Sequence, residues 1–235
     1  MTGYDALLID FGGTLALEKT PRARIYQEAA RRAGLWIDEE PMAALMGEAL
    51  AALPKHSPVR YTRPWFELFI ERIFGEELGL DGAAIVGVKE ELFARFTDPK
   101  TFGVFPDARV LLGAARAAQI PVAVVSNWTD TLDALIEGLE LGPFGAIASS
   151  AALSVEKPDR GIFEWALGRI GVPAERALHV GDSYSNDVVG ARALGIEAVL
   201  LDRGGASTHP KTEVVRTLDA LVDRIFPSGD ADGGR

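Results

Sequence analysis

Short runs of apolar residues that end in polar residues recur along this chain. Four runs are clear and a fifth is weaker: Ala6–Phe11, Pro121–Asn127, Ala177–Asp182 and Glu197–Asp202, with Ala146–Ser149 as the weaker one. Continuous aliphatic runs of this length are typical of parallel strands that are covered on both faces. Helical periodicity separates them, at Ala108–Ala118, Thr131–Leu139, Gly161–Ile170 and Asp187–Leu194. This alternation predicts an α/β fold, with a doubly wound parallel sheet of the Rossmann-like type.

From about residue 17 to residue 99 the pattern changes to helices alone. The predicted helices are Arg22–Ala33, Glu39–Leu53, Trp65–Leu78 and Ala83–Phe96, and glycine and proline residues separate them. We therefore predict a core made of residues 1–16 and 100–227, with an inserted α-helical cap domain at 17–99. The segment 228–235 is rich in Gly and Asp, and we expect it to be a disordered tail.

Composition narrows the classes of function. The chain has 235 residues, of which 48% are hydrophobic, so it can bury a sizeable core. Its formal net charge of -10 disfavours nucleic acid and anionic membranes as partners. It has no cysteine, which excludes disulfides, thiolate catalysis and cysteine-based zinc sites. No signal region or apolar run of membrane-spanning length is evident, so we expect a cytoplasmic protein. As a separate expectation, we take it to be a monomer or homodimer.

Four polar motifs follow predicted strands or lie in adjoining loops. They are Asp10-Phe11-Gly12-Gly13-Thr14, Val124-Val125-Ser126-Asn127, Glu156-Lys157-Pro158-Asp159 and Gly181-Asp182-Ser183-Tyr184-Ser185-Asn186-Asp187. Right-handed crossovers bring the carboxyl ends of parallel strands to one edge of the sheet. We therefore expect the four motifs to meet there.

The residue types in these motifs suit phosphoryl transfer. A carboxylate such as Asp10 can attack phosphorus and form an aspartyl-phosphate, which divides hydrolysis into two easier steps. Asp182 and Asp187 could hold Mg²⁺, a hard cation that prefers oxygen ligands. Lys157 would add positive charge near the nucleophile and the phosphate.

Ser126 and the backbone amide of Asn127 would donate hydrogen bonds to phosphate oxygens.

Each motif also has a simpler interpretation. Aspartates and glycines are common in turns after strands, and Ser126 or Asn127 could cap the following helix. The joint occurrence of all four motifs, in this order, favours the chemical interpretation.

With these motifs, the chain resembles the haloacid dehalogenase-like (HAD) hydrolase superfamily, in the group with a helical cap inserted after the first motif. The resemblance extends from Ala6 to about Arg203, and Gly-Asp-Ser-x-x-x-Asp is its most specific motif. It implies Asp10 as nucleophile, Lys157 as anchoring lysine, Ser126 as phosphate ligand and Thr14 as support for the first loop. It also implies Asp182, Asp187, Asp10 and the backbone carbonyl of Gly12 as Mg²⁺ ligands. We count Thr14 with Ser126 and Asn127 among the candidate phosphate-binding residues. The implied substrate is a small phosphorylated metabolite.

Gly12 departs from the pattern of the family's phosphatases, which usually have Asp at this position. Their second aspartate protonates the leaving group and then activates water. Gly12 keeps the backbone carbonyl and lacks the carboxyl, so metal binding should survive while acid–base help is lost, at a cost of roughly 10²–10⁴ in rate. Esters with good leaving groups, such as aryl phosphates, should suffer least.

Three interpretations of function stay open on the sequence. The chain could be a Mg²⁺-dependent phosphatase of a small phosphomonoester. It could be a degenerate member that binds a phosphorylated ligand or a protein partner with little turnover. It could also hydrolyse a carbon–halogen or carbon–phosphorus bond, and Lys55 lies about where a Schiff-base lysine of the carbon–phosphorus hydrolases would fall.

A few further residues carry expectations. We expect Trp128 to form part of the pocket wall, and His179 to be a hydrogen-bonded residue of the core. Glu18 follows the first motif and could lend a carboxyl, although a solvated position is the simpler expectation. The basic stretch 55–63 of the cap could contact the substrate, or it could be a solvated loop.

Overall fold

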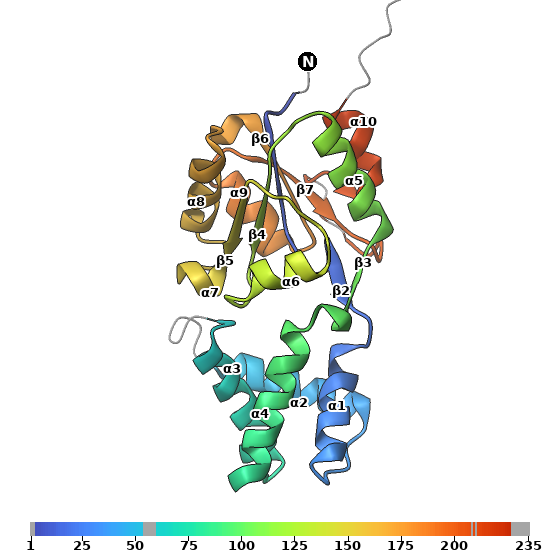
Figure 1. Ribbon diagram of the computed structural model, residues 1–235, viewed down its shortest axis with the longest axis vertical. Coiled ribbons are helices and arrows are strands. Elements are labelled where there is room, and N and C mark those ends of the chain that lie inside the picture. The colour runs from blue at the N-terminus through green and yellow to red at the C-terminus, as the bar shows by residue number, and fades with distance from the viewer. Residues whose placement is uncertain (1–2, 54–59, 208, 210, 227–235) are drawn as a thin grey trace, which may run out of the picture.

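The computed structural model describes residues 3–53, 60–207, 209 and 211–226. The predicted tail at 228–235 and the candidate Lys55 both lie outside this range. The described chain forms a sheet with helices on both sides, and a bundle of helices beneath one edge of that sheet (Figure 1).

A six-stranded sheet forms the centre of the core, in the order β5-β4-β1-β6-β7-β8. The strands are β1 (Ala6–Ile9), β4 (Val122–Ser126), β5 (Ala146–Ser149), β6 (Ala177–Gly181), β7 (Glu197–Leu201) and β8 (Val214–Val215). All neighbouring pairs are parallel, and Ile9 of β1 lies opposite Val124 of β4 and Val180 of β6. The doubly wound parallel sheet predicted from the sequence is confirmed.

Alternate residues of the strands face two separate hydrophobic clusters, because successive side chains point to opposite faces. On β1, Leu7 and Ile9 pack with α5 (Pro106–Ala117), α6 (Leu132–Gly138) and α10 (Val222–Ile225). Ala6 and Leu8 pack on the other face with α8 (Arg160–Ile170) and α9 (Val189–Arg192). Both faces of β1 are thus covered, which explains its unbroken apolar sequence.

A two-stranded antiparallel ribbon leads from the core into the helical bundle and back. It consists of β2 (Ala16–Glu18) and β3 (Phe102–Val104), with Leu17 opposite Gly103. Between these strands lie α1 (Arg22–Arg32), α2 (Glu39–Ala52), α3 (Arg63–Ile70), the π-helix η1 (Glu71–Glu77) and α4 (Gly82–Thr97). We call this bundle the cap. Its buried residues form a third hydrophobic cluster, which includes Tyr26, Met42 and Phe74.

The remaining elements are short. They are α7 (Ser150–Leu153), the π-helix η4 (Tyr184–Val188) and the 3₁₀ helices η2 (Pro99–Thr101), η3 (Ala174–Arg176) and η5 (Asp219–Leu221). Within the described residues, no helix is both long and apolar enough to cross a membrane.

Candidate active site

Asp10 directly follows β1, is almost fully buried, and lines a cavity together with the cap residues Arg22 and Tyr61. Its carboxylate accepts hydrogen bonds from Ser126 Oγ (2.9 Å) and from Lys157 Nζ (2.7 Å). Both bonds end on Oδ1. Burial raises the pKa of Asp10, and the nearby charge of Asp187 raises it further, while Lys157 and Ser126 act in the opposite direction. Three of the four sequence motifs therefore meet at one carboxylate.

Lys157 lies in the loop before α8 and is also buried. Its ammonium group joins Asp10 to Asp187, with Nζ 2.6 Å from Asp187 Oδ1. Burial alone would lower the pKa of Lys157, but the two carboxylates hold it above its ordinary value. The side chain of Asn127 fixes the Lys157 backbone, since Nδ2 donates to its carbonyl and Oδ1 accepts from its N–H. Asn127 thus positions the lysine.

Asp182 and Asp187 complete a cluster of carboxylates with Asp10. One oxygen from each of the three lies within 4.8 Å of the others. Asp187 is buried, and its carboxylate contacts His179 Nε2 (2.9 Å) and accepts from the Ser183 N–H (2.9 Å). Burial alone would raise the pKa of Asp187, but Lys157 and His179 keep it below its usual range.

Asp182 differs from the other two carboxylates because its residue remains in contact with solvent. Partial burial, together with the charges of Asp10 and Asp187, raises the pKa of Asp182 to about 7. Three carboxylates face the single ammonium of Lys157, so the cluster has an excess of negative charge. A hard divalent cation would balance that excess, and the all-oxygen donor set suits Mg²⁺.

The turn after β1 packs closely against its surroundings. Gly13 has φ +74°, and a Cβ at this position would collide with the Asp182 carboxylate. A Cβ at Gly12 would lie 2.9 Å from the Trp128 ring. Thr14 is fully buried and its side chain does not line the cavity at Asp10. Its carbonyl accepts a hydrogen bond from Arg203, so Thr14 belongs to the support of the turn.

A cavity of about 230 Å³ opens above Asp10, between the core and the cap; we call it the catalytic cavity. Glu18, Arg22 and Tyr61 form part of its wall. The side chain of Glu18 is only 5% exposed and forms an ion pair with Arg22, so the expectation of a solvated Glu18 was wrong. Trp128 lines the cavity, as predicted.

The sequence indicated some of these residues only in part. His179 is buried and hydrogen-bonded, as predicted, but the sequence around it did not show that its partner would be Asp187. Arg22 was not singled out, and Tyr61 was included only as part of the basic stretch 55–63. Both lie in or beside the cap, and only the folding of the cap over the sheet brings them to the catalytic cavity.

A sequence model of the haloacid dehalogenase-like hydrolases matches residues 4–195. The chain belongs to this family of hydrolases. Haloacid dehalogenase-like hydrolase domain-containing protein 3 of Danio rerio is 34% identical over 171 residues, which are 71% of this chain and 71% of that protein. The phosphoserine phosphatase of Thermus thermophilus is 28% identical over 231 residues, covering 87% of this chain and 91% of that protein.

Solved structures of the HAD family share the fold. A HAD phosphatase from Thermococcus onnurineus superposes with a TM-score of 0.71 at 24% identity, over 95% of this chain and 98% of that one. A dehalogenase superposes with a TM-score of 0.70 at 22% identity, over 95% and 97% of the two chains. The same HAD architecture therefore occurs with more than one activity, and the site has to decide the chemistry.

Proposed function

We propose that this HAD hydrolase is a Mg²⁺-dependent phosphatase that acts on a small phosphomonoester through an aspartyl-phosphate on Asp10. The observation that carries the proposal is the contact of one carboxylate, Asp10, with both Ser126 and Lys157 beside two further carboxylates. A nucleophile, two donors for phosphate oxygens and a set of oxygen ligands for a cation are the groups that phosphoryl transfer requires.

In the first step, an oxygen of Asp10 attacks phosphorus and the bond to the ester oxygen breaks. Because Ser126 and Lys157 hold Oδ1, we assign the attack to Oδ2. The leaving oxygen takes the bonding electron pair and a proton from water. In the second step, water attacks the phosphorus of the acyl phosphate, which releases inorganic phosphate and restores Asp10. Ser126, Lys157 and the Asn127 amide would stabilise the equatorial oxygens in both steps.

Mg²⁺, held by Asp10, Asp182, Asp187 and the Gly12 carbonyl, would neutralise charge on the phosphoryl oxygens. His179 and the Ser183 N–H keep the Asp187 carboxylate in place for this role. Lys157 reduces the repulsion between Asp10 and Asp187.

Replacing the nucleophile tests the mechanism. We expect Asp10→Asn to reduce phosphate release from p-nitrophenyl phosphate by roughly 10³-fold or more, because an amide cannot form the acyl phosphate. Circular dichroism should show an unchanged fold. Asp5→Asn makes the same change at an exposed position, where Asp5 pairs with Arg176, and should keep full activity. Undiminished turnover by Asp10→Asn would refute the mechanism.

Metal binding is tested separately from activity. A ligand that binds only the folded state raises its stability, by about 2.7 kcal/mol at a concentration a hundred times Kd. We therefore expect Mg²⁺ to raise the melting temperature of the chain, and Asp182→Asn to remove most of this rise. Asp5→Asn is again the matched control. An equal Mg²⁺ effect in both variants would mean that the cation binds elsewhere.

The partner expected from the sequence, a small phosphorylated metabolite, is part of this proposal. The catalytic cavity supports a small ligand, since its volume is about 230 Å³. The exclusion of nucleic acid and membranes rests on the net charge of -10, and the expectation of a monomer or homodimer and of a cytoplasmic location stays a prediction.

A further inference from the structure

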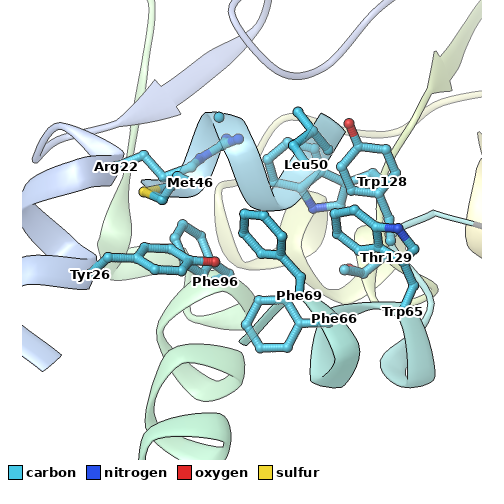
Figure 2. Close-up of a pocket in the computed structure, with 12 residues that line it drawn as sticks. Arg22, Tyr26, Met46, Leu50, Trp65, Phe66, Phe69, Phe96, Trp128 and Thr129 are labelled. Carbon is cyan, nitrogen blue, oxygen red and sulfur yellow. The ribbon is translucent and has the colours of Figure 1, made fainter. Parts of the chain in front are cut away.

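A second cavity, of about 220 Å³, lies between the cap and the core, and we call it the aromatic pocket (Figure 2). Seven of the residues that line it are aromatic: Tyr26, Tyr61, Trp65, Phe66, Phe69, Phe96 and Trp128. Trp65 and Phe69 stack nearly parallel, with their ring centroids 5.3 Å apart. Met46 and Leu50 of α2 add aliphatic surface.

The aromatic pocket adjoins the catalytic cavity. Arg22, Tyr61 and Trp128 line both spaces. Trp128 is the residue on the core side, and it directly follows Asn127, which fixes the backbone of Lys157. A molecule with its phosphate at Asp10 therefore reaches the aromatic pocket by passing these three side chains.

We propose that the aromatic pocket binds the alcohol part of the substrate, and that this part carries an aromatic ring. The inference rests on the proposed function and adds the substrate class: a phosphate ester of an aromatic or arylmethyl alcohol. The ring gains apolar contact and edge-to-face or offset-stacked packing against the aromatic side chains of the pocket.

Four phosphate compounds separate recognition of a ring from the quality of the leaving group. Ethyl and benzyl phosphate both release an alkoxide, but only benzyl phosphate carries a ring. Acetyl and phenyl phosphate both have good leaving groups, but only phenyl phosphate carries a ring. We expect kcat/KM for benzyl phosphate to exceed that for ethyl phosphate by about 10-fold or more, which corresponds to burial of an apolar ring.

The outcomes of this comparison are distinct. Equal kcat/KM for benzyl and ethyl phosphate, with Asp10-dependent hydrolysis of acetyl and phenyl phosphate, would refute the aromatic pocket and leave the phosphatase intact. Phosphate release from none of the four would refute both.

Substitutions of residues that line the aromatic pocket test whether the ring of the substrate binds there. Leu50 lines the aromatic pocket and is 44% exposed, whereas Leu68 lies outside it and is 45% exposed. We expect Leu50→Asp to lower the ratio of kcat/KM for benzyl phosphate to that for acetyl phosphate by about 10-fold, because it places a charge beside the ring. Leu68→Asp should leave the ratio unchanged. Equal ratios in both variants would contradict the proposal.

A second pair of substitutions tests the same pocket without destabilising the fold. Gly47 of α2 lines the aromatic pocket, and a Cβ there would meet no atom within 4 Å. Gly87 of α4 is equally open and lies outside that pocket. Gly47→Leu narrows the pocket and should reduce the same ratio, while Gly87→Leu should not. Glycine is a poor helix former, so both substitutions favour the helix.

Discussion

Gly12 leaves the turn after β1 without a side-chain acid, and Trp128 covers the place where one would project. A Cβ at Gly12 would lie 2.9 Å from the edge of the Trp128 ring. That ring is held in turn by Phe11 and Phe102, with centroids 5.0 and 5.7 Å away. Glycine at position 12 and tryptophan at position 128 are therefore a matched pair.

This pairing predicts the outcome of restoring an acid. We expect Gly12→Asp alone to give no gain in kcat on ethyl phosphate, because the packed Trp128 ring blocks the new side chain. In a Trp128→Ala background, adding Gly12→Asp should raise kcat on ethyl phosphate, by up to roughly 10²–10⁴ if the carboxyl reaches the leaving oxygen. Trp128→Ala alone is the control. A large gain from Gly12→Asp alone would show that Trp128 moves freely.

Arg203 supports the same turn from beneath. Its guanidinium donates to the carbonyls of Gly13 and Thr14 and forms two bonds to Asp107, at the start of α5. Burial alone would raise the pKa of Asp107, but the bonds from Arg203 and from the Leu218 N–H keep it below its usual range. Asp107 therefore stabilises the fold as a carboxylate.

The lowered pKa of Asp107 gives its contribution a definite pH dependence. The contribution is fully present above the unfolded pKa of about 3.9, and it is lost as the pH falls through the lower folded value. At neutral pH, Asp107→Asn should cost about 1–3 kcal/mol in the free energy of unfolding. Urea denaturation should show a constant gap to the wild type down to about pH 5 and a shrinking gap below about pH 4. A gap that does not change with pH would contradict this assignment.

At the scale of elements, the sequence predicted the central strands well because their hydrophobic runs depend on burial alone. The five predicted strands occur within one or two residues of their expected ends. The ribbon of β2 and β3 was not predicted, because its three-residue strands are too short for a periodic pattern. The predicted helix 65–78 is instead α3 followed by the π-helix η1, whose widened hydrogen bonding leaves no distinct signal in hydrophobicity.

The residues of the candidate site also fall into two groups, those that the sequence could predict and those that it could not. Asp10, Ser126, Lys157, Asp182 and Asp187 could be found from the sequence, because each lies at the end of a strand or in the segment that follows one. The topology brings these segments to one edge of the parallel sheet. The pairing of Glu18 with Arg22 and the place of Tyr61 in the cavity wall could not be predicted, because they depend on how the cap sits over the sheet. The aromatic pocket depends on the same contact, and its Phe and Trp residues look like ordinary core residues in the sequence.

At the scale of the whole molecule, the cap and the core have separate hydrophobic clusters. The buried residues of the cap cluster all lie between Ile25 and Leu92, and the two clusters beside the sheet contain none of them. Phe96 packs, partly buried, against both the cap cluster and one core cluster. We therefore expect the cap to loosen without unfolding the sheet.

Hydrogen exchange can test this expectation. Phe74 is fully buried in the cap cluster, and Phe163 is fully buried in a core cluster. Replacing either by alanine should cost about 3–5 kcal/mol locally, through lost contacts and a new cavity. Phe74→Ala should speed amide exchange in α1 and α3 and leave β1 and β4 protected, whereas Phe163→Ala should speed exchange in the sheet. Faster exchange in the same segments of both variants would show a single cooperative unit.

The whole cap is an insertion between the two strands of the short β2–β3 ribbon. The chain leaves the core at Glu18 and returns at Phe102, and these two residues are paired neighbours. A tight turn could therefore join the two strands directly and close the core without disturbing the sheet or the carboxylates at its edge. In evolutionary terms, the ribbon is a point of exchange: a different insertion there would change what reaches Asp10 while the reactive groups stay as they are.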